Sequence, residues 1–74
     1  MNSNELMLRA LQALVDAVKE GGSLGAPGGV MYAALMGKLT LQQFETMMRV
    51  LVSQGYLRRQ GDLYHFVRDV IPAS

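Results

Sequence analysis

The stretch Leu39–Gly55, LTLQQFETMMRVLVSQG, carries the signals of a complete amphipathic helix. Thr40 and Gln43 have the spacing of a capping box, in which each side chain accepts a hydrogen bond from the backbone N–H of the other residue. Gly55 suits the left-handed position that ends a helix. The residues between these signals separate into two faces at helical spacing. The apolar face holds Phe44, Met47, Met48, Leu51 and Val52, and the polar face holds Gln42, Glu45, Thr46, Arg49 and Ser53.

A β-hairpin is predicted directly after this helix, in YLRRQGDLYHFV at residues 56–67. Gly61-Asp62 fits a two-residue turn with glycine first, and this turn pairs Leu57 with Phe66. Gln60-Gly61 is an alternative turn that shifts the pairing. With the first turn, we expect Leu57 and Phe66 to pack beneath the helix.

Two further helices are predicted earlier in the chain. Residues 4–20 have polar side chains at helical spacing opposite a broad apolar sector, and residues 28–37 form a compact helix that is apolar almost all round and therefore largely buried. The loop Gly21–Gly29 lacks the lysine of a phosphate-binding loop, so a structural role is expected. Within it, Ser23-Leu24-Gly25 is expected to form a short edge strand, with Leu24 pointing into the core.

The apolar sector of the first helix is too broad for a single neighbour. One interpretation is that the second and third helices cover both of its sides. The other is that a second copy of the chain packs against Ala10, Ala13 and Ala17, which makes the protein a homodimer through its first helix.

The composition indicates one small globular domain. Half of the 74 residues are apolar, and there is no cysteine, which excludes disulfides and thiolate metal sites. The longest apolar run, VMYAALM at residues 30–36, is too short to span a bilayer, and MNSNE at the start does not resemble a signal peptide. We therefore expect a cytoplasmic protein without membrane contact. The net charge is +1, and the basic excess lies after residue 37.

The sequence contains no arrangement typical of catalysis. His65 is the single histidine, and its position in a predicted strand favours a half-exposed structural residue. The serines have no histidine and carboxylate partners at a suggestive spacing, and the carboxylates do not form a close pair. We expect no enzymatic activity, no cofactor and no metal.

From Asn4 to Val67 the chain resembles the winged helix-turn-helix superfamily. The resemblance rests on the helix that ends at Gly37, on the Thr40-capped helix, and on VSQGYLRRQGDLYHF at residues 52–66, which is similar to the passage from helix to wing in small bacterial and phage regulators. It implies a single domain of class α+β, mainly helical, over residues 1–74. This domain is a three-helix cluster with a C-terminal β-hairpin, with helices at residues 4–20, 28–37 and 40–54, the hairpin at 56–67 and a tail at 68–74.

This resemblance implies a DNA-binding protein, a transcriptional regulator or accessory factor, whose third helix lies in the major groove of duplex DNA. The implied contacts to bases and phosphates come from Lys38, Gln42, Gln43, Thr46, Arg49, Arg58 and Arg59. A two-fold dimer is expected, since a monomer makes few contacts. The alternative is a winged-helix module for protein interaction or assembly that binds no nucleic acid. The polar face is then a plain solvated surface on which Glu45 and Arg49 form an ion pair one turn apart.

Overall fold

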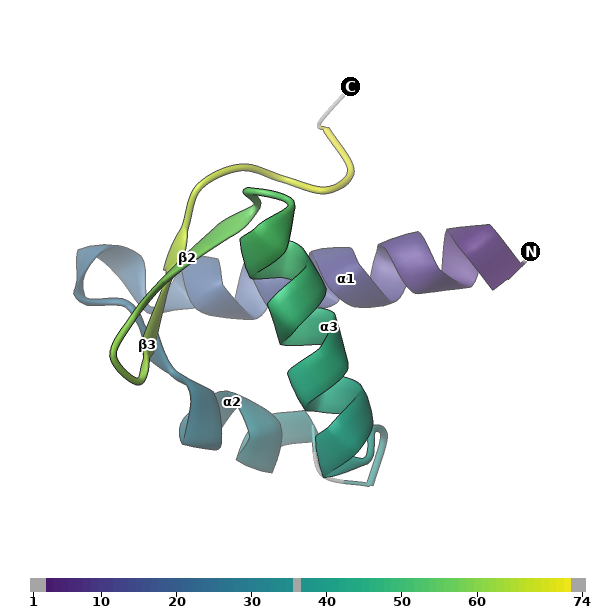
Figure 1. Cartoon of the computed structure of the whole chain (residues 1–74), viewed down its shortest axis with the longest axis horizontal. Helices are drawn as coiled ribbons and strands as arrows, with labels where there is room; N and C mark the ends of the chain where they lie inside the picture. Colours follow the sequence, from purple (N-terminus) through teal and green to yellow (C-terminus); the bar gives the residue numbers. More distant parts are fainter. Residues whose placement is uncertain (1–2, 36, 73–74) are drawn as a thin grey trace.

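Three α-helices and a three-stranded antiparallel sheet form the fold of residues 3–35 and 37–72, which are the residues that the computed structural model describes (Figure 1). The elements are α1 (Ser3–Glu20), the 3₁₀ turn η1 (Gly22–Leu24), β1 (Ala26–Pro27), α2 (Gly28–Leu35), α3 (Leu41–Ser53), β2 (Leu57–Gln60) and β3 (Leu63–Phe66). The strand order is β1-β3-β2. Figure 1 shows α3 crossing in front of α1, with the β2–β3 hairpin to one side. The predicted α+β, mainly helical class is confirmed.

Each of the two long helices contributes one row of apolar side chains to the core. On α1 the buried residues recur at helical spacing, and on α3 they are the predicted apolar face with Val52 at its half-buried edge. Met31 of α2, Ala26 of β1 and Leu57 of β2 close the cluster. The core residues of the two long helices are Leu11, Leu14, Val15, Val18, Phe44, Met47, Met48 and Leu51. Since each stripe is buried, the opposite face of each helix is directed outward.

Both ends of α3 are closed as predicted. The Thr40 Oγ1 accepts from the Gln43 N–H at 3.0 Å, and the Gln43 Oε1 accepts from the Thr40 N–H at 2.9 Å. Gly55 has a φ of 83°, and the Tyr56 N–H donates to the Leu51 carbonyl at 2.9 Å. The predicted helix of residues 40–54 therefore contains α3 together with its two capping residues.

The hairpin has the register set by the Gly61-Asp62 turn. Leu57 pairs with Phe66 and Gln60 pairs with Leu63, so the alternative turn is excluded. Gly61 has a φ of 61°, and no non-glycine residue in the described ranges has a positive φ. These dihedral signs match a type II′ turn, whose twist suits paired strands.

Phe66 does not pack beneath α3, so that part of the prediction was wrong. Leu57 is 2% exposed, but Phe66 is 42% exposed and lies under the ammonium of Lys19, whose Nζ is 4.7 Å from the ring centroid. Because β3 packs against α1, the ring meets the last turn of α1. The contact is a cation–π interaction at the surface.

The short edge strand was predicted three residues too early. Ser23 and Leu24 lie in η1, and Leu24 is 82% exposed instead of pointing into the core. Ala26 and Pro27 form the strand and pair with Tyr64 and Leu63 of β3. Which of the two segments becomes a strand depends on which one meets β3, and this contact is tertiary.

The second helix is more exposed than predicted. In α2, Met31 is 4% exposed, but Val30 is 66% exposed. An eight-residue helix that lies at the edge of the core has only one side to bury, so a uniformly apolar sequence leaves apolar side chains in water. The prediction extended this helix to residue 37, and residue 36 lies outside the described residues.

The first helix extends beyond the rest of the fold at its N-terminal end (Figure 1). It packs against β1, β3, α2 and α3, yet Leu6, Met7 and Leu8 are 57%, 52% and 44% exposed. Ala10 and Ala17 pack at the margin of the core, whereas Ala13 is exposed. Cover within the chain is therefore partial, and the homodimer stays a prediction.

Gln12 fastens the C-terminal tail to α1. Its Oε1 accepts from the backbone N–H groups of Val70 and Ile71 at 2.7 and 2.9 Å, and its Nε2 donates to the Asp69 Oδ1 at 2.8 Å. Asp69 also forms an ion pair with Lys19. One glutamine side chain thus accepts from two backbone N–H groups that are nearly 60 residues away in sequence. No pattern in the sequence predicts this contact.

The ion pair between Lys19 and Asp69 lowers the pKa of the acid and raises the pKa of the base. The hydrogen bond from Lys19, followed by the one from Gln12, lowers the pKa of Asp69 below its usual 3.8. The hydrogen bond to Asp69 raises the pKa of Lys19 above its usual 10.5. Both side chains are partly exposed, so solvent weakens the interaction.

Replacing Gln12 with methionine should lower the free energy of unfolding by about 1–2 kcal/mol, because two backbone amides lose their acceptor and the methionine side chain has similar length. Chemical denaturation measures the loss, and the Val70 and Ile71 amides should lose protection from hydrogen exchange. The control is Gln60→Met at an exposed strand end, which should be neutral. Equal stability of the two variants would contradict the role assigned to Gln12.

Replacing Asp69 with asparagine should lower the melting temperature at neutral pH and leave it unchanged in strong acid. The folded pKa of Asp69 is depressed, so its contribution is present above pH 3.8 and is lost as the pH falls through the lower folded value. The melting temperatures of wild type and variant, measured from pH 7 downward, should therefore converge once the pH lies below the lowered folded pKa of Asp69. A difference that stays constant over this range would show that the charge of Asp69 does not contribute.

Candidate functional site

The outward side of α3 carries a row of polar side chains, flanked by the exposed apolar residues Leu41 and Val50. We define the α3 outer face as Gln42, Thr46, Arg49 and Ser53, which recur three or four residues apart and are all exposed. The buried stripe lies on the opposite side of the helix, so packing of the core directs these side chains to solvent. Ser53 donates from its hydroxyl to the Val50 carbonyl at 3.0 Å, a bond within the helix.

The seven basic side chains fall into two groups. Three are held by contacts within the chain: Lys19 by Asp69 and Phe66, Arg68 by the Gln54 carbonyl and the Tyr56 ring, and Arg59 by the Gly61 carbonyl and the Tyr64 ring. The other four form no hydrogen bond, ion pair or ring contact among residues 3–35 and 37–72. These are Arg9, Lys38, Arg49 and Arg58. Three of these four belong to the predicted set, and an anionic partner can engage them without breaking an internal bond.

Glu45 and Arg49 do not pair with each other. From the sequence, the alternative to DNA binding is a plain solvated face with an ion pair between these two residues, one helical turn apart. Within the described part of the chain, neither side chain forms an ion pair, and both are exposed. The expected pair is therefore absent from this conformation. An exposed pair of this kind gains little energy, since two long side chains must be ordered to form it.

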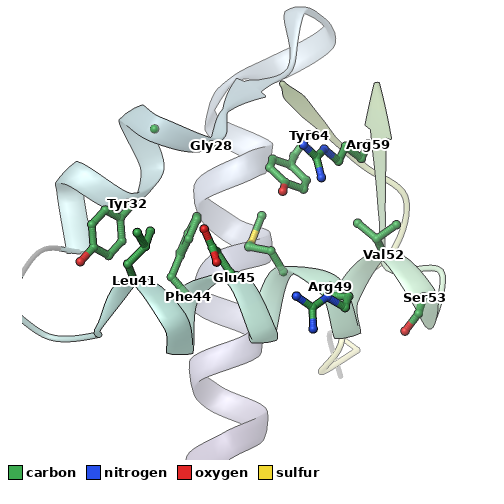
Figure 2. Close-up of a pocket in the computed structure, with 12 residues that line it drawn as sticks. Gly28, Tyr32, Leu41, Phe44, Glu45, Arg49, Val52, Ser53, Arg59 and Tyr64 are labelled. Atoms are coloured by element: carbon green, nitrogen blue, oxygen red, sulfur yellow. The ribbon is translucent and has the colours of Figure 1, made fainter. Parts of the chain in front are cut away.

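A cleft separates α3 from the hairpin (Figure 2). It has a volume of about 560 Å³ and is closed at one end by the first turns of α2. Figure 2 shows Glu45 and Arg49 rising from α3 on one side, with Arg59 and Tyr64 of the hairpin on the other. We call this the α3–hairpin cleft. Its lining consists of Gly28, Gly29, Tyr32, Leu41, Phe44, Glu45, Met48, Arg49, Val52, Ser53, Arg59 and Tyr64.

A second hollow of about 540 Å³ runs between the first halves of α1 and α3. We call this the α1–α3 groove. Its floor is apolar, and among the described residues no charged side chain lines it. Its lining consists of Ser3, Leu6, Met7, Ala10, Leu39, Thr40, Gln42, Gln43, Thr46 and Met47. The Gln43 side-chain oxygen Oε1 accepts a hydrogen bond in the capping box, and its Nε2 amide group has no partner among the described residues.

The predicted contact residues therefore border different hollows. Arg49 and Arg59 share the α3–hairpin cleft, whereas Gln42, Gln43 and Thr46 border the α1–α3 groove. Arg58 alternates with Arg59 along β2 and borders a third hollow. Lys38 is exposed in the turn before α3 and lines none of the three hollows.

The third hollow lies at the far end of α1, where Lys19, His65 and Phe66 join Arg58. His65 is half-buried in β3, as predicted, and its Nε2 is buried without a hydrogen-bond partner in the described residues. The ring lies so close to Gly25 that a Cβ at that position would come within 2.7 Å of its Cε1. His65 is therefore held by packing against the η1 segment.

Sequence reasoning missed Tyr32 and Tyr64, which also line the α3–hairpin cleft, and it assigned Glu45 only to a solvated face. The register of the hairpin contains a signal for Tyr64, because this residue lies opposite Arg59 on the same side of the strands. No such signal exists for Tyr32. Its ring reaches the cleft through tilted packing on Phe44, with 5.4 Å between the ring centroids.

The described residues contain no group of three histidine, cysteine or acidic side chains placed to hold a metal ion. Over the same residues, no helix has the length and apolar character needed to cross a membrane. Comparisons of the chain with protein-family models, with curated proteins and with solved structures gave no match.

Proposed function

We propose that the chain is a small winged-helix DNA-binding protein, a transcriptional regulator or accessory factor, which places α3 in the major groove with the hairpin beside it. The chain order α1-β1-α2-α3-β2-β3 and the strand order β1-β3-β2 are compatible with this layout. In it, α2 supports α3 through a short turn, and the hairpin is the wing.

The observation that carries the proposal is the α3 outer face with an uncommitted Arg49 at its centre. Arginine reads guanine through two hydrogen bonds, and glutamine reads adenine in the same way. Gln42 and Arg49 lie about two turns apart on one side of the helix, which suits readout along one stretch of groove. Neither side chain has to leave an internal partner among the described residues.

Phosphate contacts are assigned to the margins of this face. Lys38 precedes the N-terminus of α3, where the helix dipole also favours a negative charge. Arg59 lies across the cleft and is already oriented by the Gly61 carbonyl at 2.9 Å and by the Tyr64 ring. The proposed surface does not include Arg58, because strand alternation turns this side chain away from the cleft.

A dimer is part of the proposal. One α3 outer face offers few base contacts, and two-fold symmetry doubles them. The exposed apolar residues at the start of α1, Leu6, Met7 and Leu8, are the proposed contact between copies. Ala13 continues the exposed side of this helix.

The second candidate function is a protein-interaction module, and the α1–α3 groove favours it. This groove is apolar and is bordered by Leu6 and Met7, which are more than half exposed, and no charged side chain of residues 3–35 and 37–72 lines it. A partner helix with an apolar face suits such a groove. In this case the chain should not bind duplex DNA even at low salt.

The DNA-binding proposal predicts retention of mixed-sequence duplex at low salt, with an affinity that falls steeply as salt rises, because bound phosphates release counterions. Arg49→Gln should cost about 1–3 kcal/mol of binding free energy on a preferred site. Lys38→Gln should weaken binding to all sequences alike and reduce the salt slope by about 1. Fluorescence anisotropy over a salt series measures both effects.

Arg58→Gln is the matched control for this series. It also removes one exposed positive charge, but Arg58 borders the third hollow and faces away from the α3–hairpin cleft. All three variants should melt within a few degrees of wild type, since the side chains are exposed. If Arg58→Gln weakens binding as much as Arg49→Gln, only net charge matters and the assigned surface is wrong.

The dimer is tested by light scattering after size exclusion. Leu6→Gln should shift the population toward monomer, because it places a polar group in the proposed apolar contact. Leu24→Gln is the control, as Leu24 is even more exposed but lies on η1 at the other end of α1. A wild-type chain that is monomeric at millimolar concentration would remove the dimer from the proposal.

A further inference from the structure

We propose that Glu45 is a specificity-determining residue, which accepts a hydrogen bond from the exocyclic amine of a cytosine in the major groove while Arg49 reads a nearby guanine. This inference rests on the DNA-binding function proposed above. It assigns a base preference to one side of the α3 outer face.

The position of Glu45 is unusual for a surface that meets a polyanion. Its carboxylate is exposed, lines the α3–hairpin cleft together with Arg49 and Arg59, and forms an ion pair with neither within the described ranges (Figure 2). Its charge is therefore not cancelled by a fixed partner. A carboxylate that faces backbone phosphates is repelled by them, so Glu45 should weaken binding to DNA of arbitrary sequence.

A base that offers a donor removes this penalty. Cytosine presents its N4 amine in the major groove, and adenine presents its N6 amine beside the N7 acceptor. The second oxygen of a carboxylate is repelled by that acceptor, so cytosine is the better partner for Glu45. Thymine and guanine present acceptors at this edge and should be disfavoured.

The spacing of the two residues sets the spacing of the two bases. Glu45 and Arg49 are one helical turn apart, or about 6 Å along the axis of α3. Successive base pairs rise by about 3.4 Å, so this turn spans about two base pairs. The predicted site therefore contains a cytosine and a guanine at neighbouring or next-neighbouring positions. The carboxylate acts mainly by rejecting other bases, which raises the ratio of specific to non-specific binding.

The test selects bound sequences from a randomised duplex library, using the full chain as wild type, Glu45→Gln and Glu20→Gln. Glu20→Gln is the matched control, because it removes one exposed carboxylate at the end of α1. Affinities are then measured on the selected duplex and on the same duplex with the cytosine pair replaced by a thymine pair. Melting curves for both variants verify that they are folded.

Wild type should prefer the cytosine duplex by about 5-fold or more. Glu45→Gln should reduce this preference toward one and should bind random duplex more tightly than Glu20→Gln does. If wild type binds duplex but Glu45→Gln selects the same bases with the same preference, the role of Glu45 is refuted and the proposed function stands. If wild type retains no duplex at low salt, both the role of Glu45 and the proposed function are refuted.

Discussion

Burial of one side of α3 against α1 and the hairpin is the constraint on which the rest of the structure depends. Leu51 and Met48 are 0% and 1% exposed, and with Leu14, Val15 and Val18 of α1 they form the centre of the core. The buried residues occupy one side of the helix, so Gln42, Thr46 and Arg49 on the opposite side point toward solvent. The capping box and the closing turn at Gly55 set the two ends of that helix, and they thereby set where the hairpin begins.

The packing and the closing turn of α3 determine the position of the hairpin. Leu57 enters the core one residue after the turn that closes α3, which brings β2 against the end of that helix. Since side chains alternate along a strand, burial of Leu57 places Arg59 on the same side, facing the cleft, and Arg58 on the other. Two adjacent arginines that look equivalent in the sequence therefore have different surroundings. Arg59 is held by a backbone carbonyl and a tyrosine ring, whereas Arg58 has no such partner in the part of the chain that the structure describes.

The charges on the presented surface are sparse, and this affects how the surface works. A strongly basic helix binds nucleic acid of any sequence, whereas α3 carries one arginine and one carboxylate along its exposed side. Such a face gains little from phosphates alone. In the DNA-binding function that we propose, this face depends on base contacts, on the flanking cations Lys38 and Arg59, and on a second copy of the domain. The exposed apolar start of α1 and the low net charge of the chain are the features on which the proposed dimer rests.

The sequence by itself determined the elements with strong local signals. These are α3 with both of its ends, the hairpin and its preferred turn, and the polar face opposite the apolar stripe, because caps, glycine turns and helical periodicity act over a few residues. The tertiary structure decided which residues near Leu24 form the edge strand, where Phe66 packs, and that Gln12 holds the tail at Val70. It also decided which predicted residues share a surface, since that depends on how α2, α3 and the hairpin meet. These outcomes require contacts between segments far apart in the chain. A local sequence pattern does not specify which distant segment packs against it.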